Sequence, residues 1–182
     1  MKIATSLLAL TLSGSAFAGT EAGLIVGFDS MKADLNGETS DSETGMMFGL
    51  RGGTELSDGV VLDAQFLRHS ASTSEGGVTA SATQMVVGIG ARYYIGDGSL
   101  KPFAAGHANY HLGANASLSG NGSSLDSEVP GSSGMGADVG GGAQFAISDS
   151  LYAEGLAYYS LQFSGDIKYN TLAFGAGFGA KF

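Results

Sequence analysis

Residues 172–182 alternate between apolar side chains and small or polar ones. They read Leu172-Ala173-Phe174-Gly175-Ala176-Gly177-Phe178-Gly179-Ala180-Lys181-Phe182. Every second side chain of a β-strand points to the same face, so Leu172, Phe174 and Phe178 share one face and the glycines share the other. The stretch therefore predicts a strand with one continuous apolar face and one narrow face.

Seven further segments alternate in the same way. With the stretch above, the predicted strands cover residues 22–33, 44–54, 60–69, 82–95, 102–112, 135–147, 151–163 and 168–182. The sixth segment is the clearest, with Val139 and Phe145 opposite Asp138. The fifth is the least regular, because Phe103 falls on its polar side. Eight successive strands of this kind predict an all-β, eight-stranded antiparallel up-and-down barrel.

The connections between these segments differ in length at the two ends. Short links fall at residues 55–59, 96–99 and 148–150. The other end has long polar loops at residues 34–43, 70–81 and 113–134, and a last short link at 164–166. Tight turns at one end and mostly long polar loops at the other are typical of a transmembrane β-barrel.

The charges indicate which face of the barrel is outside. A soluble barrel of the lipocalin kind would need a wetted outer face, with its apolar face lining a ligand cavity. Only 14% of the residues are charged, and within the strand cores we find none on the apolar face. A charge facing lipid at mid-membrane costs about 2–4 kcal/mol. We therefore expect a transmembrane β-barrel, with the apolar face toward lipid and the glycine-rich polar face lining the lumen.

The first residues predict export. Lys2 precedes an apolar stretch at residues 3–12, and Ala16-Phe17-Ala18 resembles a signal-peptidase site. We predict a signal peptide at 1–18 and a barrel domain at 19–182. The chain has no cysteine, which excludes disulfides and thiol chemistry, and its net charge of −9 disfavours nucleic-acid binding.

The chain resembles the small outer-membrane barrels typified by the membrane domain of outer membrane protein A, outer membrane protein X and the opacity adhesins. Residues 172–182 carry this resemblance, together with Gly90-Ala91-Arg92-Tyr93-Tyr94 and Lys101-Pro102-Phe103-Ala104, which are similar to the family's fourth-to-fifth strand hairpin. The resemblance implies a bacterial outer-membrane location. It implies that Phe174, Phe178 and Phe182 form the signal read by the barrel-assembly machinery. Outer-membrane lipids, lipopolysaccharide and periplasmic chaperones are the further partners expected.

Four charged residues are predicted to meet inside the barrel. Arg51, Asp63, Arg92 and Glu154 all fall on the polar face near the tight-turn end. Isolated buried charges are costly, so two positive and two negative groups in a narrow lumen should pair. The pairs would either plug the lumen or gate a path for ions.

The histidines do not predict a metal or catalytic centre. His107 and His111 share a strand face about 13 Å apart, at about 3.3 Å per residue, which is too far to ligate one ion. Some small barrels modify lipids with Ser and His groups, and His69, Ser70 and His111 lie near the outer rim. None has a recognisable nucleophile–base setting. We expect no enzyme activity, no metal and no cofactor.

The predicted outer loops are acidic. Their carboxylates are Asp34, Glu38, Asp41, Glu43, Glu75, Asp126 and Glu128. They form either a solvated surface or contacts to divalent cations that bridge lipopolysaccharide. We expect a monomeric, non-enzymatic barrel that supports envelope integrity or presents its loops for adhesion. The alternatives are a narrow channel for ions or small solutes, and a lipid-modifying enzyme.

Overall fold

The computed structural model describes residues 19–35, 37–40, 42–120 and 123–182. Its strands are β1 (Thr20–Leu35), β2 (Glu38–Thr39), β3 (Glu43–Ser57), β4 (Val60–Glu75), β5 (Val78–Tyr94), β6 (Leu100–Gly120), β7 (Ser123–Val129), β8 (Gly134–Ala146), β9 (Leu151–Gln162) and β10 (Ile167–Lys181). Among the described residues, no helix has the length and apolar character needed to cross a membrane. The predicted signal peptide, residues 1–18, lies outside the described residues.

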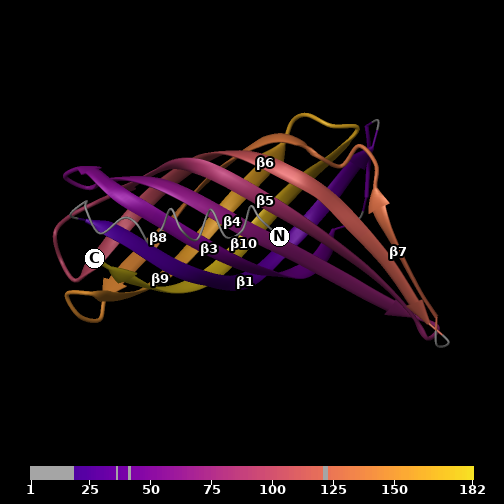
Figure 1. Ribbon diagram of the computed structural model, residues 1–182, viewed down its shortest axis with the longest axis horizontal. Coiled ribbons are helices and arrows are strands. Elements are labelled where there is room, and N and C mark those ends of the chain that lie inside the picture. Colours follow the sequence, from indigo (N-terminus) through magenta and orange to yellow (C-terminus); the bar gives the residue numbers. More distant parts are fainter. Residues whose placement is uncertain (1–18, 36, 41, 121–122) are drawn as a thin grey trace.

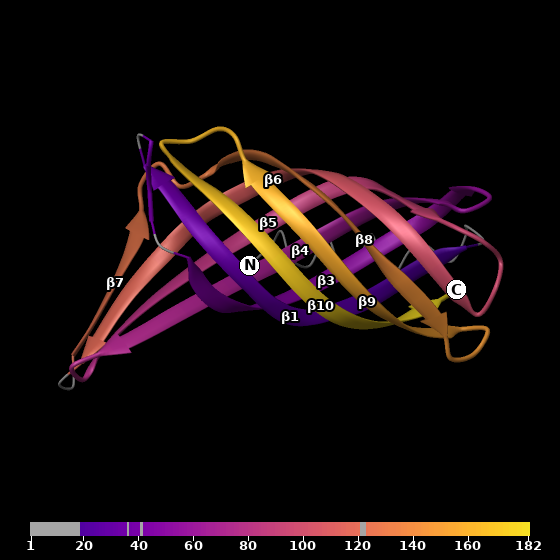
Figure 2. The same cartoon turned by 180° about the vertical axis from the view of Figure 1, so that it is seen from behind.

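Eight strands form a closed antiparallel ring. In order they are β1, β3, β4, β5, β6, β8, β9 and β10, and β10 pairs with β1 (Figures 1 and 2). Following the paired residues from Ala22 once around the ring leads to Lys32, ten residues further along β1. This offset makes the strands tilt strongly against the barrel axis. The predicted fold class, an eight-stranded up-and-down barrel, is confirmed.

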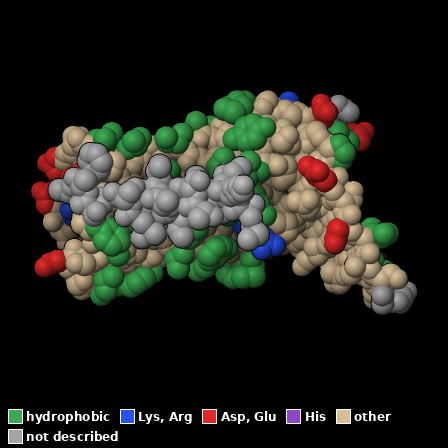
Figure 3. Space-filling model, in the orientation of Figure 1, with side chains coloured by type: hydrophobic (Ala, Val, Ile, Leu, Met, Phe, Trp, Pro, Cys, Tyr) green, Lys and Arg blue, Asp and Glu red, His purple; other side chains and the backbone are tan. Residues whose placement is uncertain are grey.

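The outer wall of the barrel is apolar. Leu24, Phe48 and Val139 are exposed on it, and Figure 3 shows hydrophobic side chains along the wall with acidic groups at both ends. The tight turns lie at one end, where Gly59 takes a positive φ of 75° that favours glycine. The wall therefore has the apolar band that a lipid-facing surface requires.

The predicted charge-free outer face has three exceptions, all at the outer ends of the strands. Lys32, Arg68 and Lys168 are exposed, and each lies next to at least one buried residue in its strand, which places its side chain on the outer face. Long cationic side chains at this level can keep their charged ends in the aqueous boundary while the stems cover apolar surface.

Two of the predicted loops, residues 70–81 and 113–134, are largely strand. The β4–β5 ladder continues to the pair Glu75–Val78, and Gly76 and Gly77 make the turn with φ of 58° and 82°. Gly-Gly allows the two positive φ angles of a tight hairpin turn. The β5–β6 ladder continues to the pair Val78–Gly120, and β7 pairs with the end of β6. Residues 70–84, 113–120 and 123–129 form a four-stranded projecting sheet in the order β4-β5-β6-β7 (Figure 1).

Candidate functional site

The four predicted charged residues meet in the lumen near the tight turns. Arg51 from β3 donates a hydrogen bond to Glu154 from β9, and Arg92 from β5 donates one to Asp63 from β4. Arg51 Nε also lies 3.8 Å from Asp63 Oδ2, and Arg92 Nη1 lies 4.0 Å from Glu154 Oε2. All four are buried, so each charge is compensated where water is excluded.

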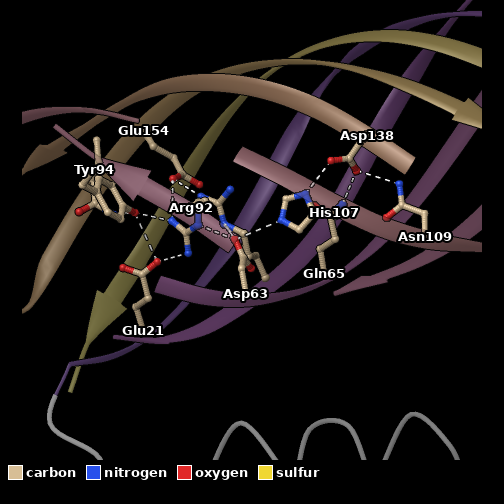
Figure 4. A network of polar contacts seen from close by, with 11 residues as sticks. Glu21, Asp63, Gln65, Arg92, Tyr94, His107, Asn109, Asp138 and Glu154 are labelled. Carbon is tan, nitrogen blue, oxygen red and sulfur yellow. Dashed lines mark hydrogen bonds and ion pairs between the residues drawn. The ribbon is translucent and has the colours of Figure 1, made fainter. Parts of the chain in front are cut away.

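Three members of this network were not predicted from the sequence. Arg92 also donates to the Glu21 carboxylate and to the Tyr94 hydroxyl (Figure 4). Gln144 donates to the same hydroxyl at 3.0 Å. Glu21 lies one residue before the predicted start of the first strand. Tyr94 follows the outward Tyr93, and its inward direction follows from the strict alternation of β5.

The contacts of the Phe103 side chain explain why this aromatic residue lies on the polar face of its strand. Its side chain is only 5% exposed, and it packs edge-on against Tyr94 with ring centroids 5.5 Å apart. The guanidinium carbons of Arg51 and Arg92 lie 5.8 Å and 5.9 Å from the centre of its ring. A ring face attracts cations, so this inward aromatic residue supports both arginines.

The polar contacts continue along the lumen through His107. Its Nδ1 lies 2.6 Å from Asp138 Oδ1, and its Nε2 lies 3.5 Å from Asp63 Oδ2. Gln65 and Asn109 donate to the other Asp138 oxygen at 2.7 Å and 2.9 Å (Figure 4). The carboxylate of Asp138 is therefore held by three neighbours on β4 and β6.

An apolar cluster shares the middle of the lumen with these polar groups. Its members, from five strands, are Ile25, Met47, Leu67, Val86 and Ala173. A cavity of about 20 Å³ lies beside Ile25, Phe103 and Leu156, and has room for about one water molecule. The described side chains thus fill the middle of the lumen with ion pairs and apolar packing, and a cavity of about 230 Å³ beside Glu21, Tyr94 and Lys181 remains at the tight-turn end.

Toward the outer mouth, the histidines occupy separate positions. His69 Nδ1 lies 2.5 Å from Asp29 Oδ2, and His111 is buried with no hydrogen-bond partner for either ring nitrogen among the described residues. The described residues hold no group of three or more side chains suited to a metal ion. Gln162 Nε2 donates to the backbone oxygens of Ser132, Ser164 and Ile167, which ties the outer connections over the mouth.

The two faces of the projecting sheet differ from those of the barrel wall. The face continuous with the outer wall becomes polar, and includes Ser70, Ser72, Ser74, Thr79, Ser81, Thr83, Asn115, Ser117, Ser119, Ser124, Asp126 and Glu128. The face continuous with the lumen becomes mainly apolar. It includes Ala71, Val78, Ala80, Ala82, Ala114, Ala116, Leu118, Leu125 and Val129, together with Thr73, Glu75, Ser123 and Ser127. The wetted outer face shows that the sheet stands above the lipid-facing band.

A closed barrel with an apolar outer wall and a polar, charge-paired lumen is the architecture of a transmembrane outer-membrane barrel. Residues 4–182 match the family model described as outer membrane protein beta-barrel domain, so the chain belongs to this family, and its location is the bacterial outer membrane. No match was found among curated protein sequences.

Three solved structures share the fold at low sequence identity. Neisserial surface protein A is 15% identical with a TM-score of 0.65, over 88% of this chain and 97% of that one. The attachment invasion locus protein Ail of Yersinia pestis is 18% identical with a TM-score of 0.53, over 88% and 99%. The outer membrane protease OmpT of Escherichia coli is 10% identical with a TM-score of 0.51, over 90% and 96%.

Proposed function

We propose that this protein is a non-enzymatic surface-binding protein, in which the barrel anchors the projecting sheet outside the membrane and the sheet contacts partners. The observation that carries the proposal is the apolar face of the sheet. Leu125 is 73% exposed and Leu118 is 51% exposed, although both stand beyond the lipid-facing band. Exposed, contiguous apolar surface on a soluble part of a protein marks an interaction site.

The blocked middle of the lumen supports an anchoring role for the barrel. The ion pairs of Arg51 and Arg92 occupy its tight-turn end, and the cluster around Leu67 occupies part of its middle. A conducting path would need both to separate, which would leave buried charges uncompensated. We therefore place a narrow channel second.

The burial of the histidines supports a non-enzymatic role. His69 and His111 are 2% and 1% exposed, and both point into the lumen rather than toward lipid. A lipid-modifying centre would need its base within hydrogen-bond reach of a substrate. Labelled lipopolysaccharide tests this directly. An acyl chain released by the intact protein and not by the His69→Ala or His111→Ala variant would overturn the proposal.

We also propose that the barrel contacts lipopolysaccharide at its outer rim. Lys32, Arg68 and Lys168 point outward there, and cationic side chains attract anionic lipid head groups. A role in envelope integrity would follow from this contact. It predicts that replacing the three cations with glutamine sensitises cells to detergent, whereas shortening the projecting sheet does not.

Adhesion tests the main proposal. Cells displaying the intact protein are compared with cells whose sheet is shortened by joining residues 71 and 82, and 114 and 129, through tight turns. We expect binding to surfaces coated with extracellular proteins to be lost on shortening, while heat-modifiable migration on gels shows a folded barrel. Equal adhesion by both cell types would contradict the proposal.

A further inference from the structure

We infer that the apolar face of the projecting sheet binds a cationic, amphipathic polypeptide segment. This inference rests on the proposed surface-binding function and specifies the chemistry of the partner. It follows from two observations: the distal half of the apolar face is uncovered, and the charged side chains of the projecting sheet are all acidic.

The base of the apolar face is covered and its distal half is not. Near the barrel, Ala71 and Ala114 are buried against Met31 and Tyr169. Farther out, Leu118 pairs with Leu125 across β6 and β7, and Val78 is 43% exposed. A sheet with one apolar and one polar face is stable when another layer covers the apolar face. Among the described residues, none covers this distal half, so a partner has to supply the layer.

The charges of the sheet select the sign of that partner. The projecting sheet contains Glu75, Asp126 and Glu128 and neither Lys nor Arg. Glu75 lies opposite Val78 at the tip, on the apolar face itself, while Asp126 and Glu128 project from the polar face of β7, the edge strand of the sheet. All three are exposed. A segment could place apolar side chains on the leucines and cationic ones toward Glu75 at the tip and, over the β7 edge, toward Asp126 and Glu128. Such a segment would match the surface in both respects.

The same charges disfavour three other occupants. Lipopolysaccharide would bring anionic phosphates with its acyl chains, and a second copy of this chain would bring the same carboxylates. A polyanion would also be repelled. Ail, which shares the fold, has been crystallised with the heparin analogue sucrose octasulfate. In the present protein, the acidic projecting sheet predicts a preference for cationic ligands over anionic ones.

Two labelled peptides test the inference on the full chain in nanodiscs of zwitterionic lipid. One alternates leucine with lysine and the other alternates leucine with glutamate. We expect saturable binding of the lysine peptide, at least about tenfold tighter than that of the glutamate peptide, and weakening as salt increases. Nanodiscs without protein report binding to lipid. Equal binding of both peptides would overturn the inference.

Variants locate the binding on the sheet. Leu118→Ser with Leu125→Ser should weaken binding of the lysine peptide at least about tenfold, because the apolar contact is lost. The matched control, Ser117→Thr with Ser124→Thr, changes the same two strands on the opposite face and should leave binding unchanged. Glu75→Gln with Asp126→Asn and Glu128→Gln should remove the preference for lysine over glutamate. Unchanged affinity in the double-serine variant, with heat-modifiable migration intact, would also overturn the inference.

The outcomes separate this inference from the proposed function. Adhesion that depends on the sheet, without binding of the lysine peptide, would leave surface binding in place and remove the cationic partner. Peptide binding that depends on the leucines, without adhesion, would leave the cationic partner in place and remove the proposed role in adhesion.

Discussion

Arg51 of β3 and Glu154 of β9 stand 103 residues apart in the chain, and a hydrogen bond joins their side chains across the lumen. The bond is buried, and the Glu154 carboxylate has Arg92 Nη1 as a second cationic neighbour, 4.0 Å away. Opposite walls of the barrel are thus linked through its centre. The same contacts therefore stabilise the barrel and close its lumen.

Removing one partner of this pair should destabilise the barrel. Arg51→Met leaves a buried carboxylate without its hydrogen-bond donor, for an expected loss of about 3–5 kcal/mol in the free energy of unfolding. Arg51→Met with Glu154→Leu should lose less, because no charge remains unpaired. Urea unfolding in lipid vesicles, followed by far-UV circular dichroism because the chain lacks tryptophan, measures both. A double variant less stable than the single one would contradict this account.

The lumen should not conduct steadily. The ion pairs and the apolar cluster around Leu67 block its middle, so planar-bilayer recordings of the intact protein should show no sustained openings. Steady openings that vanish or change when Arg51 or Glu154 is replaced would show that these residues gate a path.

Gly177→Ala should disturb the ion-pair network of the lumen at Glu154, from the neighbouring strand β10. A Cβ at Gly177 would lie 2.6 Å from Glu154 Oε1 and 2.9 Å from the Leu24 carbonyl oxygen, so the side chain and the strand cannot both stay in place. We expect a loss of about 1–3 kcal/mol in the free energy of unfolding. Gly155→Ala is the matched control on β9, because a Cβ there meets nothing within 4 Å. Equal stability of the two variants would be evidence against the packing described.

Spin labels can test the polarity change between barrel and projecting sheet. The chain has no cysteine, so Leu62→Cys, Phe145→Cys and Ser117→Cys each provide one labelling site. Labels at 62 and 145 should be accessible to oxygen in the bilayer, and a label at 117 to a water-soluble relaxer. An aqueous environment at 62 or 145 would contradict the lipid-facing assignment.

Phe182→Ser should impair assembly in cells without changing the intrinsic stability of the barrel. Phe182 is exposed beyond the end of β10, so its loss removes little packing. We expect less folded protein in the outer membrane and unchanged refolding in detergent, both measured by heat-modifiable migration. Equal loss in both settings would indicate a structural role in place of a recognition role.

The strands were predictable because alternation is a local property. Glycine and alanine inside, with leucine and phenylalanine outside, mark β10 within eleven residues. The same rule is weaker in residues 78–83, where valine and alanine alternate with serine and threonine. That segment and the Gly76-Gly77 pair are the sequence signals that indicate the β4–β5 extension. The prediction of a loop at residues 70–81 was wrong because it gave more weight to the polar composition of the segment than to these two signals.

The sequence by itself determined how many strands form the ring and which side of each faces lipid, since both follow from neighbours along the chain. It also placed Arg51, Asp63, Arg92 and Glu154 in the lumen. Only the tertiary structure decided their partners, and it added Glu21, Tyr94 and His107, because contacts across the lumen depend on the ten-residue offset accumulated around the ring. The tertiary structure also decided that the projecting sheet forms, because the end of each of its strands is ordered by the neighbouring strand that pairs with it.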